Sequence, residues 1–313
     1  MSGDGASERV RARAILNAAR APTEHLRRVR NGFTASVWAT PGLVVKMGPA
    51  GSPCLRREWR FLRAARRAAP TLPLPPVIAF GHDRSGDFIL ERRLPGASLL
   101  ERWPAWPERT RVHCARKLAA LIRTLHDSTR RSGPSHSGSA FYRDLQRSLQ
   151  RLAGTPGLAP VVLDATRRLA RQGAETDDRT TFTVLVHNDL QFNNLLADDR
   201  GNITGLLDFG RARRAPPDLE LDLLLRFLRF PHLFACKADE GRMRPDDFAD
   251  VVPVLREALP DLFSTDGTAR LRLYSLAYDF RQLAHAPHVL STRSGTPWAR
   301  ILAVLEPTGS ARG

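Results

Sequence analysis

The sequence predicts an α+β fold of two lobes, a small N-terminal lobe of antiparallel strands with a helix and a larger, mainly helical C-terminal lobe. Short strand-like runs separated by turn signals crowd the first 95 residues, whereas apolar residues at helical spacing dominate the remainder. A chain of 313 residues with 42% hydrophobic content is long enough to bury a core in each lobe. We therefore place one lobe at residues 1–95 and the other at 96–313.

The N-terminal lobe is predicted to contain, in order, a helix over about residues 8–20, three strands, a helix around Glu58 and two more strands. In the C-terminal lobe, a polar segment rich in Ser, Gly and Pro over 128–139 predicts a loop. The predicted helices between residue 95 and residue 180 cover residues 111–126, 140–152 and 158–173. No internal repeat interrupts this order.

The most informative stretch is residues 187–195, His-Asn-Asp-Leu-Gln-Phe-Asn-Asn-Leu, followed by Leu-Asp-Phe-Gly at 207–210. It has the H-x-D-x-x-x-x-N spacing of a kinase catalytic loop. Phosphoryl transfer needs a residue that orients the attacking hydroxyl and accepts its proton, together with ligands for a metal that neutralises phosphate charge. We predict Asp189 as the base, and Asn194 and Asp208 as ligands of Mg²⁺.

A hairpin predicted between these motifs would bring them together. Residues 195–197 and 203–207 read as strands around a polar turn, so the second strand would deliver Asp208 beside Asn194. Either motif alone has a structural interpretation, as a turn or as a strand end with a satisfied polar network. Their joint occurrence, with the two acids 19 residues apart (208 − 189 = 19), favours a phosphoryl-transfer site.

These residues resemble the aminoglycoside phosphotransferase and choline kinase-like family of small-molecule kinases, and the resemblance extends over residues 30–222. It implies a bilobal, protein-kinase-like fold. In that family Gly usually stands between the His and the Asp, and Asn188 departs from this. The family also has an acid in the helix after the metal-binding strand, matched by Asp222, which we expect to brace the catalytic loop. No Ala-Pro-Glu segment follows Gly210, which disfavours a protein substrate.

The resemblance further implies a strand-borne lysine on the nucleotide phosphates and a helix-borne glutamate that holds it. Lys46, in a strand-like run and one of only three lysines, fits the first role. Glu58 fits the second, because Leu55, Glu58 and Leu62 share one helical face. The alternatives are a lysine on an edge strand that faces water, and a surface glutamate neutralised by a neighbouring arginine.

Two further segments complete the nucleotide site that the resemblance implies. Residues 30–38 would cover the phosphates, with Thr34 and Ser36 as hydroxyl contacts in place of a glycine-rich signature. Residues 92–96 would form the hinge between the lobes, where main-chain groups from Arg92 to Leu94 would hold the base.

Composition disfavours other classes of protein. The net charge of +16 invites a nucleic-acid role, but the arginines are spread over many segments, aromatic content is 7%, and no nucleic-acid-binding motif appears. Three widely separated cysteines predict free thiols in a reducing cytoplasm. Charges interrupt the apolar runs, so no signal peptide or membrane-spanning segment is expected.

The sequence does not single out the residues of the acceptor site, and each candidate group has two interpretations. One local acidic cluster has two interpretations, as a binding surface for an amine-bearing acceptor or as acids favoured at a helix N-terminus. The cluster consists of Asp239, Glu240, Asp246, Asp247 and Asp250. A second pair, Asp279 and His285, has pocket and buried structural interpretations of equal weight.

The sequence thus predicts an ATP- and Mg²⁺-dependent O-phosphotransferase whose acceptor is a small molecule with a hydroxyl group, foremost an antibiotic such as an aminoglycoside; GTP remains open as donor. A choline- or homoserine-like metabolite kinase and a protein kinase are the alternatives on the same scaffold. A non-catalytic nucleotide- or nucleic-acid-binding module is the alternative of another class. Its signature would be loss of the base or the metal ligands, and none is lost.

Overall fold

A computed structural model describes residues 4–29, 35–135, 137–155, 158–234, 244–285 and 296–305. The chain divides into two compact units. Unit 1 comprises residues 1–124 and 189–212, and unit 2 comprises 125–188 and 213–313. The predicted lobe boundary at residue 95 falls inside unit 1, because the catalytic hairpin and most of the following long helix group with the N-terminal strands.

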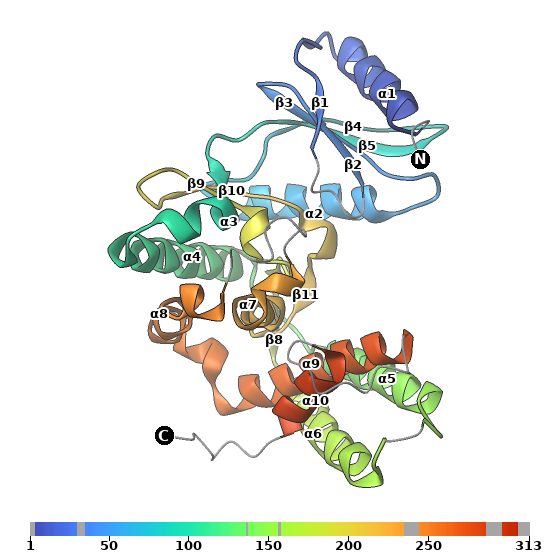
Figure 1. Cartoon of the computed structure of the whole chain (residues 1–313), viewed down its shortest axis with the longest axis vertical. Helices are drawn as coiled ribbons and strands as arrows, with labels where there is room; N and C mark the ends of the chain where they lie inside the picture. Colours follow the sequence, from blue (N-terminus) through green and yellow to red (C-terminus); the bar gives the residue numbers. More distant parts are fainter. Residues whose placement is uncertain are drawn as a thin grey trace. The chain divides into compact units, whose positions relative to one another are not determined.

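Unit 1 contains a five-stranded antiparallel sheet in the order β1-β2-β3-β5-β4 (Figure 1). Helix α1 precedes the sheet and helix α2 connects β3 to β4, which is the predicted order of a helix, three strands, a helix and two strands. The elements are α1 (Asp4–Ala18), β1 (Arg27–Arg28), β2 (Ser36–Ala39), β3 (Leu43–Met47), α2 (Cys54–Ala68), β4 (Val77–Asp83) and β5 (Gly86–Arg92).

Side chains on this sheet alternate between two environments, because successive residues of a strand point to opposite faces. One set packs beneath α1 in a hydrophobic core formed by Ala12, Ile15, Leu16, Leu26, Trp38, Val45, Met47 and Leu90. The other set, which includes Val37, Ala39, Val44, Lys46 and Glu91, lines a cavity. The face opposite α1 is therefore the one that can hold a ligand.

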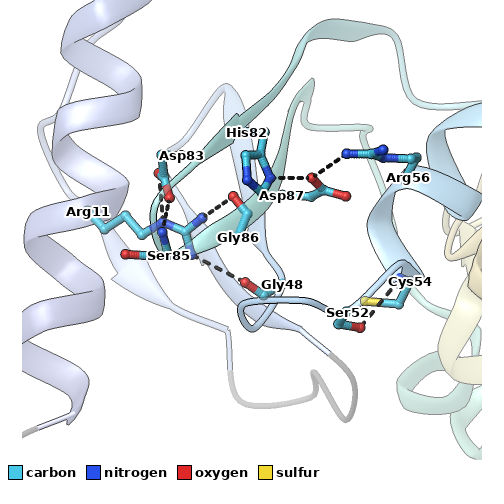
Figure 2. Close-up of polar contacts among 10 residues, drawn as sticks. All are labelled: Arg11, Gly48, Ser52, Cys54, Arg56, His82, Asp83, Ser85, Gly86 and Asp87. Carbon is cyan, nitrogen blue, oxygen red and sulfur yellow. Dashed lines mark hydrogen bonds and ion pairs between the residues drawn. The ribbon is translucent and has the colours of Figure 1, made fainter.

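Arg11 fastens α1 to the hairpin between β4 and β5 (Figure 2). Its guanidinium lies 3.0 Å from Asp83 Oδ2 and donates to the main-chain oxygens of Gly86 at 2.9 Å and Gly48 at 3.3 Å. On the same hairpin, Asp87 Oδ1 accepts from Arg56 of α2 at 3.3 Å. Both helices are thus tied to one hairpin by charge-assisted hydrogen bonds.

The remainder of unit 1 contains the predicted catalytic hairpin, which forms a second sheet in the order β10-β9-β6. In its turn, Asp198 Oδ1 accepts from the main-chain N–H groups of Arg200 and Asn202, each at 2.9 Å. The elements are β6 (Ala97–Ser98), α3 (Leu99–Arg102), η1 (Trp103–Ala105), η2 (Phe192–Asn194), β9 (Leu195–Ala197), β10 (Ile203–Leu206) and η3 (Phe209–Arg211). Helix α4 (Glu108–Thr129) carries the chain from unit 1 into unit 2.

Unit 2 is mainly helical, with one small sheet in the order β11-β8-β7. Its core is formed chiefly by α5, α6, α9 and α10. The strands are β7 (Arg131–Ser132), β8 (Phe182–Val186) and β11 (Arg213–Ala215). The α-helices are α5 (Ser137–Arg151), α6 (Pro160–Asp178), α7 (Leu219–Arg229), α8 (Val251–Ala258), α9 (Thr265–His285) and α10 (Pro297–Leu305). The short 3₁₀ turns are η4 (Pro231–Leu233), η6 (Pro245–Phe248) and η7 (Pro260–Phe263).

The loop predicted over 128–139 is wrong in part, since this segment contains β7 and the start of α5. β7 pairs with β8 through Arg131 and Thr183, and Gly133 N–H donates to Thr181 O at 2.9 Å. These hydrogen bonds come from a strand about 50 residues later in the chain, which local polarity does not reveal. Within the described residues, no helix is both long and apolar enough to cross a bilayer.

Unit 2 also buries a set of ion pairs, which we call the arginine network. Arg226 and Arg300 both donate to Asp279 Oδ1, each at 2.8 Å, and Arg270 donates to Asp218 Oδ1 at 2.7 Å. Every residue of this network is less than a tenth exposed. These contacts match the buried structural interpretation of Asp279, which also lines a small cavity with Arg226 and Arg300. The acceptor-pocket interpretation stays a prediction.

Candidate active site

Lys46 and Glu58 lie in contact, as predicted. Strand β3 carries Lys46, and Glu58 lies on the inward face of α2, where it is 4% exposed. Lys46 Nζ is 2.5 Å from Glu58 Oε1 and 3.2 Å from Glu91 Oε1. The edge-lysine and surface-glutamate alternatives are excluded, because both side chains are buried against each other.

Burial and mutual charge shift the pKa values of this group. Burial by itself would lower the pKa of Lys46, but the attraction of Glu58, Glu91 and Asp208 outweighs it and raises that pKa. Burial raises the pKa of Glu58 to about 7, against the opposing charge of Lys46 and with a further contribution from Asp208 and Glu91. Three carboxylates around one ammonium make this end of the site rich in negative charge.

The catalytic loop follows β8, and its polar groups are connected. Asn194 Nδ2 donates to Asp189 Oδ2 at 3.1 Å and to the Asp189 main-chain oxygen at 2.9 Å. Leu207 N–H donates to the Asn194 main-chain oxygen at 2.8 Å, so the hairpin returns Asp208 beside Asn194, as predicted. Asp208 has a left-handed backbone (φ 62°, ψ 76°), and its Oδ1 accepts from Gly210 N–H at 3.1 Å.

The backbone just before Asp189 explains the unusual Asn188. This residue has φ 59°, in the left-handed region that glycine enters freely and that asparagine enters more readily than most other residues. A departure from the family's glycine is therefore compatible with the loop conformation. The residue type changes, but the main-chain path that leads to Asp189 does not require a glycine.

The brace predicted at Asp222 is wrong, and Glu220 takes that place. Glu220 accepts from the main-chain N–H groups of His187 at 2.9 Å and Asn188 at 2.8 Å, and lies 3.2 Å from His126 Nε2. Burial would raise the pKa of Glu220, but His126 and the other donors outweigh burial and lower it. Asp222 instead accepts from Ser275 at 3.1 Å. Both acids lie in α7, and sequence spacing alone did not distinguish them.

The cavity in unit 1 has a volume of about 590 Å³ and is lined by residues from both ends of that unit's sequence. The lining includes Lys46, Glu58, Asn194 and Asp208. The predicted hinge residues Arg92 and Leu94 also line the cavity. The apolar lining includes Val37, Ala39, Val44, Leu94, Leu196 and Leu207. Charged groups and apolar side chains in the lining of one cavity are the features expected of a nucleotide site.

The two predicted phosphate-loop contacts have different outcomes. Ser36 Oγ donates to Glu8 Oε2 at 2.7 Å and accepts from Trp38 Nε1 at 3.1 Å, on the α1 side of the sheet and away from the cavity. The expectation for the Ser36 hydroxyl is therefore corrected: strand alternation turns Val37, rather than Ser36, toward the cavity. Thr34 lies outside the described residues.

Glu91 is a site residue that the motif search missed. It lies in β5, is 3% exposed, and contacts Lys46 through the pairing of β3 with β5. Period-two alternation in β5, which buries Leu90 beneath α1, would have placed Glu91 on the cavity side. No motif marks it.

The donor set at Asn194 and Asp208 fits a hard cation. The Asn194 amide nitrogen is committed to Asp189, so its side-chain oxygen is the group that can face a cation beside the Asp208 carboxylate. Within the described part of the chain, no three His, Cys, Asp or Glu side chains are arranged to hold a metal by themselves. Two protein oxygens are nevertheless the usual complement for Mg²⁺, which takes its other ligands from water and phosphate.

The acidic cluster predicted near the acceptor site is described only in part, since Asp239 and Glu240 lie outside the described residues. Asp246 and Asp247 fall in the first turn of η6, where Asp247 Oδ2 accepts from Arg244 N–H at 2.8 Å. This contact matches the interpretation of acids at a helix N-terminus.

Two curated proteins align with half of this chain. One is the aminoglycoside 3′-phosphotransferase of Streptomyces ribosidificus, 31% identical over 172 residues, which are 50% of this chain and 60% of that protein. The other is the aminoglycoside 3′-phosphotransferase of Streptomyces fradiae, 28% identical over 173 residues, 50% of this chain and 59% of that protein. The chain thus spans about three fifths of the length of these relatives.

Solved structures show the same fold. A thermostable mutant of aminoglycoside phosphotransferase APH(4)-Ia, in ternary complex with ADP and hygromycin B, has a TM-score of 0.65 at 15% identity and covers 94% of this chain and 97% of its own. The aminoglycoside-3′-phosphotransferase of type VIII has a TM-score of 0.54 at 22% identity, with 86% and 98% covered. The predicted α+β, protein-kinase-like fold is therefore confirmed. Residues 25–250 match the Phosphotransferase enzyme family, so the chain belongs to that family.

Proposed function

We propose that the protein is an ATP- and Mg²⁺-dependent O-phosphotransferase that transfers the γ-phosphoryl group to a hydroxyl of an aminoglycoside-type antibiotic. One observation carries the proposal: Lys46, paired with buried acids, lines the same cavity as Asn194 and Asp208, and Asn194 is hydrogen-bonded to Asp189. These are the parts that phosphoryl transfer requires. The two relatives named as aminoglycoside 3′-phosphotransferases support the class of acceptor.

Asp189 acts on the acceptor. Its carboxylate accepts the proton of the attacking hydroxyl, whose oxygen forms a bond to the γ-phosphorus while the bond to the β–γ bridging oxygen breaks and ADP leaves. The hydrogen bond from Asn194 fixes the rotamer of Asp189, so the base is held in position before the acceptor arrives.

Lys46, Asn194 and Asp208 act on the nucleotide. The ammonium of Lys46 binds the α- and β-phosphates, and Glu58 holds that ammonium in place. When bound, Mg²⁺ supplies neutralisation of phosphate charge, with Asn194 and Asp208 as its protein ligands. The apolar residues of the lining hold the base, and main-chain groups of residues 92–94 complete its binding.

The choice of acceptor rests on chemistry shared with the relatives and neighbours. Neighbouring structures hold streptomycin, gentamicin, hygromycin B or kanamycin, all bound to phosphotransferases of this fold. GTP remains an alternative donor, since one neighbour is a complex with GDP. A metabolite or protein acceptor is the second choice on the same scaffold. A cytoplasmic location stays a prediction from the cysteine pattern.

The test is a panel of acceptors. Purified protein with Mg-ATP should release ADP in the presence of aminoglycosides and add one phosphoryl group to the antibiotic, as detected by mass spectrometry. The Asp189→Asn variant is the matched control for contaminating kinases. Turnover with serine-containing peptides or simple amino alcohols, and none with aminoglycosides, would contradict the proposed acceptor class.

A further inference from the structure

A groove lies between α2 and β4 in unit 1. It consists of two adjoining hollows, of about 570 and 410 Å³, which share the side chains of Trp59, Arg63, Arg67 and Phe80. Side chains from residues 56–67 of α2 form one wall, and residues 76–80, at the start of β4, form the other. We call it the α2–β4 groove. Among the described residues, none lines both this groove and the cavity around Lys46.

The wall on α2 is a row of arginines. Arg56, Arg60, Arg63 and Arg67 line the groove at intervals of four, three and four residues, so they share one face of the helix, and all four are exposed. Glu58, the one acid in the sequence of α2, is buried on the inward face of that helix. The helix itself therefore supplies no acid to neutralise the row, and this wall of the groove is positively charged.

The wall on β4 is apolar and lies at the edge of the sheet. β4 is the last strand in the order of its sheet, and the five consecutive residues 76–80 line the groove. Successive residues of a strand point to opposite faces, so a hollow lined by five in a row follows the edge of the strand. Ile78, at an irregularity in the pairing with β5, is 47% exposed. An edge strand with an exposed apolar side chain is a surface that another chain can cover.

Two aromatic rings connect the walls and help to decide what kind of chain fits. Trp59 and Phe80 stack with ring centroids 4.7 Å apart and planes at 13°, and the guanidinium of Arg63 lies 5.3 Å from the centroid of Trp59. A single-stranded nucleic acid stacks its bases on free aromatic faces, but Phe80 and Arg63 already lie against the ring of Trp59. A peptide needs no free ring face, since its carboxylates can pair with the arginines while its apolar side chains pack along β4.

We propose that the α2–β4 groove is a docking surface for an acidic segment of a partner protein, in which carboxylates alternate with apolar side chains. The carboxylates pair with Arg60, Arg63 and Arg67, through charge-assisted hydrogen bonds. The apolar side chains cover Ile78 and remove it from water. The inference goes beyond the proposed phosphotransferase activity, because the groove and the cavity around Lys46 have separate linings.

The experiment measures fluorescence anisotropy with the full-length protein and three fluorescein-labelled probes. The first is the peptide Glu-Leu-Glu-Phe-Glu-Leu-Glu, the second is the same peptide with serine at the three apolar positions, and the third is an oligouridylate with the same number of negative charges. The wild-type protein should bind the first probe at least about 10-fold more tightly than the other two, because only that probe matches both walls. Its affinity should fall as salt is added.

The matched variant replaces Arg60, Arg63 and Arg67 together with Gln. It should bind the first peptide at least about 10-fold more weakly, because three ion pairs are lost at once. Ile78→Ser should weaken the same peptide by a smaller factor and leave the serine-containing peptide unaffected. The wild-type comparison of the three probes tests the inference even if a variant does not fold.

The control removes the same charge from another exposed helix. Arg167, Arg168 and Arg171 of α6, replaced together with Gln, should change peptide affinity less than about 2-fold. Equal losses in the two triple variants would mean that the net charge of +16 attracts the peptide without a docking surface, and would overturn the inference. Equal binding of the three probes, no binding of the first peptide, or tighter binding of the oligouridylate would also overturn it.

Discussion

The two units of the molecule both bury charged side chains, but they satisfy them differently. In the arginine network of unit 2, Asp279 accepts hydrogen bonds from two arginines and Asp218 accepts several from Arg270. In the cavity of unit 1, the carboxylates of Glu58, Glu91 and Asp208 share a single lysine. Burial of charge alone therefore does not indicate a functional site. A cluster of three carboxylates around one lysine, with all four residues lining a cavity, does.

The largest effect is expected from replacing Asp189, the residue proposed as the general base. Asp189→Asn keeps the shape of the side chain and its contact with Asn194 but removes the proton acceptor, so turnover should fall by about 10²- to 10⁴-fold. The affinity for ADP should not change, which calorimetry can check alongside steady-state rates. Near-normal turnover would contradict the assignment of the base.

Asp208→Ala tests whether a carboxylate of the cluster around Lys46 binds a metal ion. Activity should be lost together with the enhancement of nucleotide binding by Mg²⁺, because one of the two protein oxygens is removed. Titration of Mg²⁺ at fixed ADP measures this directly. Asp199→Ala, in the turn of the same hairpin, is the control, since that side chain is 79% exposed and pairs with Arg102 at the surface. An unchanged response to Mg²⁺ in the Asp208 variant would place the metal elsewhere.

In unit 2, replacing a charged residue is expected to reduce stability and to leave nucleotide binding unchanged. Arg270→Met leaves Asp218 buried without its cation and should reduce the free energy of unfolding by about 3–5 kcal/mol. The nucleotide affinity of the folded fraction should stay the same. Urea unfolding of this variant, and of the double variant Arg270→Met with Asp218→Asn, measures the cost and its partial recovery. A loss of less than about 1 kcal/mol in the free energy of unfolding would mean that this ion pair contributes no more to stability than an exposed one.

The smallest effect is a dependence of stability on pH. The pKa of Glu58 in the folded protein is about 7, above its ordinary value, so between pH 4.5 and 7 the folded state binds more protons than the unfolded state. The contribution of Glu58 to stability is therefore fully present below pH 4.5 and declines as pH rises to 7, by about 1–3 kcal/mol. The difference between the wild type and Glu58→Gln in urea unfolding isolates this term. If the stability of the wild type relative to Glu58→Gln increased with pH, the predicted direction of the pKa shift of Glu58 would be wrong.

Local spacing was enough to predict the catalytic core. The hairpin that joins Asn194 to Asp208 is short, so its strands and its turn are visible in consecutive residues. The family resemblance implied a glutamate partner for Lys46, and helical periodicity over a few turns placed Glu58 on the inward face of α2. These features depend on neighbours in the chain, and a single sequence contains them.

The remaining features depend on pairing between distant segments. Glu91 meets Lys46 only because β5 pairs with β3, and β7 exists only because β8 provides its hydrogen bonds. Ser36 faces α1 because of the phase of β2, which a motif search does not fix. Glu220 and Asp222 stand two residues apart in one helix, and only the position of the catalytic loop decides which of them it contacts.

The sheet of unit 1 has two faces: one lines the cavity, and the other packs against α1 and makes no contact with a ligand in the cavity. Each cavity residue on β2 and β3 has a chain neighbour packed beneath α1, and the inner face of α1 presents Ile15 and Leu16 to those neighbours. A change of size at either position displaces a strand rather than a ligand contact. Substitutions in α1 are thus an evolutionary route by which nucleotide affinity can change while every residue of the binding surface stays the same.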